Sequence, residues 1–103
     1  MNQAWTKSQG DEIIGSSLQG YVQVPYATLV AIFGPPHSND GYKVDAEWIL
    51  ILASGNVASI YNYKDGKNYN GESGLAVELI TDWHVGGKEK AVVPELEAIL
   101  RQE

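Results

Sequence analysis

Residues 46–64 read AEWILILASGNVASIYNYK, and they carry the strongest structural signal in the chain. Ala46 to Leu52 is apolar on both faces apart from Glu47, a pattern typical of a strand inside a sheet. Residues 54–56 (Ser-Gly-Asn) form a tight connection, and Val57 to Lys64 alternates as a returning strand. The sequence therefore predicts a β-hairpin at the centre of the fold.

Before this hairpin the sequence predicts a strand followed by a short helix. Gln19 to Val24 alternates in strand fashion, and Pro25 suits the first helical position because its missing N–H costs nothing there. The helix runs on to Phe33, where Gly34 and two prolines end it. Residues 1–17 are polar and contain serine and glycine, so we expect a flexible N-terminal arm.

After the hairpin we expect a loop, another strand and a final helix. Residues 65–74 are polar and glycine-rich, and loops of this length within a compact domain are often functional. Leu79 to Val85 is predicted as a strand closed by Gly86-Gly87, and an amphipathic helix should run from about Lys88 or Pro94 to Arg101. Residues 18–103 should thus form one α+β domain of order β-α-β-β-β-α, with helices on one face of a largely antiparallel sheet.

Charge and composition narrow the choice of partners. The chain has 103 residues and a net charge of −6, so it should repel nucleic-acid polymers and anionic membranes. It has no cysteine, no signal-peptide pattern and no apolar run that could span a membrane, so we expect a soluble cytoplasmic protein. The lysines between positions 41 and 90 are either ordinary surface charges or a local positive pocket for a small anion.

Residues that could catalyse a reaction lack the motifs that would make them effective. His84 and Asp82 occur with several serines, but no Gly-x-Ser-x-Gly sequence accompanies them. They form a pair rather than a cluster of metal ligands. We therefore expect no enzyme activity, no metal and no cofactor.

The sequence Trp-His-Val-Gly-Gly-Lys at residues 83–88 is a candidate anion site. Gly86 and Gly87 would let backbone N–H groups approach an anion, and the start of a helix would add a favourable partial charge. Lys88 or His84 would complete a phosphate site. The alternative is that the two glycines form a plain turn.

A second candidate site is aromatic. Tyr61, Tyr63 and Tyr69 offer flat faces for nucleobases, Lys64 can neutralise a phosphate, and Asn68 can read a base edge. The alternative is that Tyr61 and Tyr63 pack on the sheet as ordinary strand formers. Tyr69, in a polar loop, fits that alternative less well.

Four blocks together resemble a family of small phage proteins: residues 33–37 (FGPPH), 40–48 (DGYKVDAEW), 57–64 (VASIYNYK) and 82–87 (DWHVGG). Over residues 19–100 the chain looks like the phage anti-CBASS sponge proteins. Members of that family bind cyclic nucleotide signals of bacterial immunity, such as cyclic GMP–AMP, without cleaving them.

The resemblance implies a non-enzymatic homo-oligomer that sequesters a cyclic nucleotide in the cytoplasm of an infected host cell. It also implies a set of ligand contacts, namely Tyr61, Tyr63, Lys64, Trp83, His84, Gly86 and Gly87. The residues alone place Trp48 and Trp83 mainly in the core. Two other functions stay open: a phage protein that inhibits a host protein by direct contact through its acidic surface, and a structural phage protein.

Overall fold

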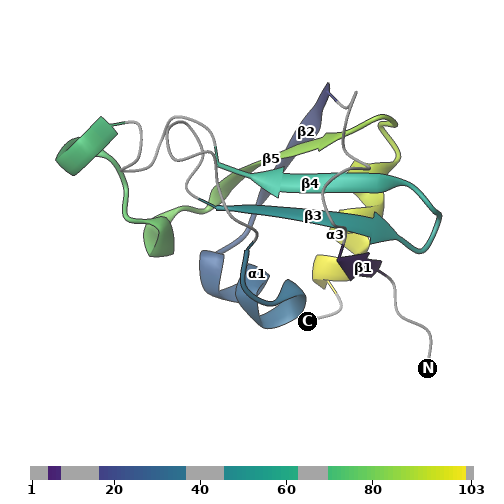
Figure 1. The fold of residues 1–103 in the computed structure, drawn as a ribbon, viewed down its shortest axis with the longest axis horizontal. Coiled ribbons are helices and arrows are strands. Elements are labelled where there is room, and N and C mark those ends of the chain that lie inside the picture. The colour runs from purple at the N-terminus through teal and green to yellow at the C-terminus, as the bar shows by residue number, and fades with distance from the viewer. Residues whose placement is uncertain (1–4, 8–16, 37–45, 63–69, 102–103) are drawn as a thin grey trace.

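The structure, a computed structural model, describes residues 5–7, 17–36, 46–62 and 70–101. Five strands form one antiparallel sheet in the order β1-β3-β4-β5-β2, and two helices cover one of its faces (Figure 1). The strands are β1 (Trp5–Lys7), β2 (Ser17–Gln23), β3 (Glu47–Leu52), β4 (Val57–Tyr61) and β5 (Asp82–Gly87). The helices are α1 (Tyr26–Phe33) and α3 (Val92–Arg101), and single 3-10 turns span η2 (Gly71–Ser73) and η3 (Val77–Leu79). The predicted α+β class is confirmed.

The core lies between the helices and one face of the sheet. Alternate residues of the central strands point toward the helices, and together with the buried side of each helix they exclude water. The buried set comprises Val22, Val24, Leu29, Phe33, Ala46, Trp48, Leu50, Leu52, Ala58, Ile60, Ile80, Trp83, Val85, Val92, Leu96 and Ile99.

Two tryptophans of the sheet fix the position of α1. The indole N–H of Trp83 donates to the carbonyl of Val24, just before α1, at 2.9 Å. The indole N–H of Trp48 donates to the carbonyl of Gly34, just after α1, at 2.8 Å. Both rings are fully buried, so each brings its one polar group into the core with a partner. The expectation that both tryptophans lie in the core is confirmed.

The predicted hairpin is confirmed, with Trp48 opposite Ile60 and Leu50 opposite Ala58. Polar groups secure both of its ends. At the turn, the Ser54 hydroxyl donates to Glu95 of α3 at 2.7 Å. At the open end, the buried Asn62 side chain accepts from the backbone N–H of Ala46 at 3.0 Å. These hydrogen bonds link the turn to α3 and link the open end of the hairpin to the backbone just before β3.

Two predictions of element boundaries were wrong. Residues 5–7 of the predicted flexible arm form β1, which pairs with β3 through Trp5 opposite Leu52. Gly86 and Gly87 do not close the last strand but belong to β5, which instead begins at Asp82. The final helix begins at Val92, within the predicted range but beyond Lys88. The remaining residues of the arm, 1–4 and 8–16, lie outside the described part of the chain.

Gly87 is required because α3 starts very close to the sheet. A Cβ at this position would lie 3.0 Å from the Val57 carbonyl oxygen and 3.1 Å from a methyl carbon of Val92. The carbonyl belongs to a paired strand and cannot move away freely, so Gly87→Ala should lower the free energy of unfolding by about 1–3 kcal/mol. Urea denaturation followed by circular dichroism measures the loss. The exposed neighbour Glu89→Ala should stay within about 0.5 kcal/mol of wild type; equal stability of Gly87→Ala would contradict the close approach.

Candidate functional site

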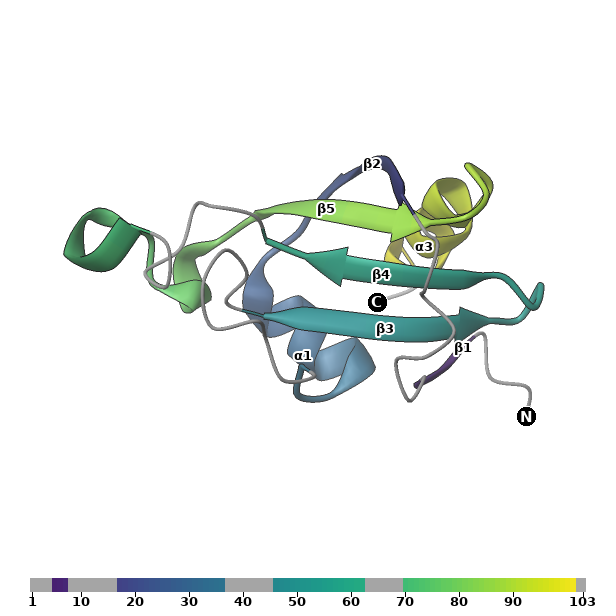
Figure 2. The same cartoon turned by 45° about the horizontal axis from the view of Figure 1, so that its top comes forward.

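The face of the sheet opposite α1 and α3 carries the best candidate site among the described residues. Figure 2 shows β2, β5, β4 and β3 side by side, with both helices on the far side. Strand pairing places Tyr21 of β2 opposite His84 of β5, and His84 opposite Tyr61 of β4. Since these positions alternate with the buried core residues, the three rings share the helix-free face. We call Tyr21, His84 and Tyr61 the aromatic row.

The rings of the aromatic row touch one another. The imidazole of His84 lies in the middle, with its centroid 5.0 Å from that of Tyr21 and 5.4 Å from that of Tyr61. The Tyr21 ring meets it nearly edge-on at 68°, whereas the Tyr61 ring is tilted by only 30°. Tyr21 is 60% exposed, and His84 and Tyr61 are half-buried. The row therefore presents aromatic surface to solvent on a support of paired strands.

Small residues lie beside the aromatic row, two positions away from it along each strand. Gly86 follows His84 on the same face and pairs with Ser59 of β4. A Cβ on Gly86 would lie 2.6 Å from the Ser59 hydroxyl oxygen and 3.4 Å from the Tyr61 ring. The Tyr61 ring thus lies close to a glycine, where any side chain would meet both the Ser59 hydroxyl and the ring.

Acidic residues lie at one end of this face. Asp82 precedes His84 on β5, and Glu47 of β3 lies opposite Tyr61, so one end of the face is acidic. Lys88 is exposed in the bend that follows β5.

The structure places some of the predicted site residues on the helix-free face and one of them in the core. Tyr61 and His84 lie opposite each other on neighbouring strands, and Lys88 lies in the exposed bend after β5. Trp83 is fully buried and belongs to the core, so it offers no surface to a ligand in this structure. The remaining predicted contacts Tyr63, Lys64, Asn68 and Tyr69 lie outside the described residues.

The turn predicted at Gly86-Gly87, either as an anion site or as a plain turn, was wrong. Both glycines are buried in β5, where Gly86 pairs with Ser59 and Leu18 on either side. Their backbone groups serve the sheet rather than a bound anion, and α3 begins four residues after Lys88. The predicted site also omitted Tyr21, although the alternation of Tyr21 with the apolar Val22 already indicates an exposed ring on β2.

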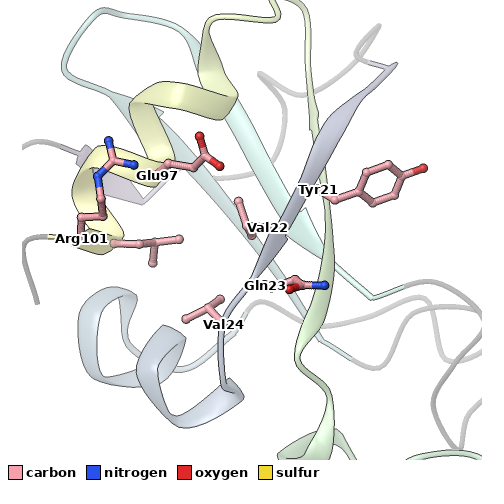
Figure 3. Close-up of a pocket in the computed structure, with 7 residues that line it drawn as sticks. Tyr21, Val22, Gln23, Val24, Glu97 and Arg101 are labelled. Carbon is pink, nitrogen blue, oxygen red and sulfur yellow. The ribbon is translucent and has the colours of Figure 1, made fainter.

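A second surface feature lies at the edge of the sheet, beside β2. A groove of about 490 Å³ runs between β2 and the end of α3, lined by Tyr21, Val22, Gln23, Val24, Glu97, Leu100 and Arg101 (Figure 3). Val22 and Val24 point toward α3, whereas Tyr21 points to the opposite side. The groove and the aromatic row therefore lie on different faces and meet only at Tyr21.

Among the described residues, no three histidine or acidic side chains gather where they could hold a metal ion. None of the helices in that part of the chain is long and apolar enough to cross a membrane. Compared with models of protein families, with curated proteins and with solved structures, the chain matches none. A functional assignment therefore depends on the helix-free face and on the sequence resemblance.

Proposed function

We propose that this protein binds a cyclic nucleotide on the aromatic row and holds it without cleaving it. In this proposal it is a phage counter-defence protein that sequesters an immune signal of the host. The observation that carries the binding proposal is the contact of Tyr21, His84 and Tyr61 across three neighbouring strands of a helix-free face. The counter-defence role comes from the sequence resemblance.

Stacking supplies the main attraction in this proposal. A nucleobase on an aromatic side chain gains about 1–3 kcal/mol, and it does so whatever the base. The aromatic row offers such a surface on rings that already support one another, so little side-chain freedom is lost on binding. Asp82 and Glu47 repel phosphates from their end of the face, and we propose that Lys88, exposed in the bend after β5, pairs with one of the phosphates.

The same contacts explain why the ligand would be stored rather than converted. Stacking and a surface lysine stabilise the bound ground state, and neither becomes stronger in a transition state of phosphodiester cleavage. A sequestering protein needs only affinity and abundance. An otherwise acidic surface, with a net charge of −6, disfavours long nucleic acids while tolerating a small ligand with few phosphates.

Calorimetric titration tests this proposal directly. The purified chain is titrated with a panel of cyclic di- and trinucleotides, with the corresponding linear dinucleotides and inorganic phosphate as controls. We expect at least one cyclic nucleotide to bind tightly and to be recovered intact by chromatography after the protein is denatured. Recovery of cleaved ligand would make the protein an enzyme. Absence of binding across the panel would contradict the proposal and favour the alternative of an inhibitor that contacts a host protein.

A further inference from the structure

We propose that the free edge of β2 binds an extended segment of another protein that carries lysine or arginine, and that this segment adds to the sheet as a further strand. The sheet order places β2 at one end, with β5 as its only neighbour among the described strands. β2 spans seven residues, and Leu18 and Tyr21 expose 47% and 60% of their surface. A long edge strand with exposed apolar side chains is a template for the addition of a strand.

The backbone of β2 has donors and acceptors directed away from the sheet. The N–H of Val24 donates to the carbonyl of Thr81 at 2.8 Å, so Val24 faces β5. In an antiparallel ladder every second residue faces the same neighbour, and Val22 therefore also faces β5. Tyr21 and Gln23 consequently direct their N–H and C=O groups outward, where a strand of another protein can pair with them.

The groove beside this edge can receive every second side chain of an added strand. α3 packs tightly on β2 near its start, where a Cβ on Gly20 would lie 3.0 Å from a methyl carbon of Val93. The groove lies further along, beside the end of α3 (Figure 3). Paired residues of neighbouring strands point their side chains to the same face of a sheet. A residue opposite Val22 would therefore point into the groove, over the aliphatic surface of Val22 and Leu100.

Acidic side chains flank the edge on both faces of the sheet. Glu97 is exposed and lies beside Val22 on the helix side (Figure 3). On the helix-free side, Asp82 accepts a hydrogen bond from the Gln23 side chain at 2.9 Å. A lysine or arginine of the added strand can cover the groove with its aliphatic part and reach Glu97 with its charge. A second one, on the other face, can contact Asp82 and the exposed Tyr21 ring. These charges favour a basic segment over an acidic one.

Arg101 restricts where the basic residues of the segment can lie. It lines the groove one helical turn after Glu97, at the end of α3. Its charge repels a lysine or arginine at that end, so the basic side chain belongs beside Glu97. Both residues lie on the helix side, away from the aromatic row. Binding of the segment therefore does not depend on nucleotide binding, and its test is separate from the test of the proposed function.

Fluorescence polarisation tests the proposal with the full chain and a short labelled peptide of alternating lysine and valine. We expect saturable binding of this peptide. A peptide with glutamate in place of lysine tests the charge, and a lysine–valine peptide with methylated backbone nitrogens tests strand pairing, because it keeps the charges and lacks the N–H donors. Both should bind at least about tenfold more weakly. Equal binding of the methylated peptide would mean attraction without strand addition and would overturn the proposal.

Two opposite changes of charge make the test specific for the groove. Glu97→Lys should weaken binding of the lysine–valine peptide about 3- to 10-fold, whereas Arg101→Glu should strengthen it by a similar factor. Both side chains are exposed, so both variants should fold, which circular dichroism checks. Glu97→Lys should also keep the nucleotide affinity of wild type. Absence of peptide binding to wild type, or binding that neither variant changes, would contradict a site at this edge.

A second copy of this chain is the competing occupant of the edge. Analytical ultracentrifugation of the chain with and without the lysine–valine peptide distinguishes the two. We expect one peptide bound to a single 11.2 kDa chain. A dimer that excludes the peptide would assign the edge to a second copy and would also overturn the proposal.

Discussion

Replacing Trp83 by alanine is expected to lower the free energy of unfolding by about 3–5 kcal/mol. The side chain is fully buried, and its ring centroid lies 5.5 Å from that of Trp48 and 6.3 Å from that of Tyr26. The substitution leaves a cavity between the sheet and α1 and removes the hydrogen bond to the Val24 carbonyl. For a small domain such a loss is a large part of the total stability. Urea denaturation followed by far-ultraviolet circular dichroism measures it.

Trp83→Phe is the matched control. It keeps most of the apolar ring and loses the N–H donor to Val24, so it should cost less, about 1–3 kcal/mol. A loss below about 1 kcal/mol for Trp83→Ala would contradict the core position. The control also separates packing from binding: folded Trp83→Phe should bind ligand as wild type does. Loss of binding in that variant would restore Trp83 as the ligand contact that the resemblance implied.

The hairpin and α1 could be predicted because their signals are local. The apolar run before Leu52 and the turn around Gly55 define two paired strands, and no distant residue is needed to interpret them. Pro25 and Gly34 define the ends of α1 in the same way. Each of these features depends on the conformational preferences of neighbouring residues, which the sequence displays directly.

Long-range pairing could not be predicted in this way. β1 is three residues in a polar segment, and it forms a strand because Trp5 meets Leu52 of β3 far along the chain. Gly86 has a weak local preference for strands, yet neighbours on both sides pair with it. Two consecutive glycines favour a turn at that position, but strand pairing on both sides outweighs this preference.

The candidate site was predictable only in part for the same reason. His84 and Tyr61 were predicted as contacts of a common ligand, but nothing local indicates that β2 lies on the other side of β5. Tyr21 therefore joins them through a register that spans most of the chain. The alternation of Tyr21 with Val22 indicates an exposed ring on β2, but the sequence does not indicate which rings lie next to it.

Removing the outer rings of the aromatic row should nearly abolish nucleotide binding. Each of Tyr21→Ala and Tyr61→Ala should weaken the affinity for the cyclic nucleotide that binds wild type by roughly 5- to 150-fold, because each removes one stacking surface worth about 1–3 kcal/mol. The double variant should show little binding at all. Tyr21 is mostly exposed, so its replacement should change stability by no more than about 0.5 kcal/mol. Calorimetric titration of the folded variants measures the affinities.

Conservative variants identify stacking as the cause. Tyr21→Phe and Tyr61→Phe keep the ring and lose the hydroxyl, so both should bind within a few-fold of wild type. Leu79→Ala removes an equally exposed apolar side chain from η3, away from the row, and should have no effect. If the phenylalanine variants lose as much affinity as the alanine variants, hydroxyl hydrogen bonds rather than stacking hold the ligand. If the folded double variant binds as wild type does, the ligand site lies elsewhere on the chain.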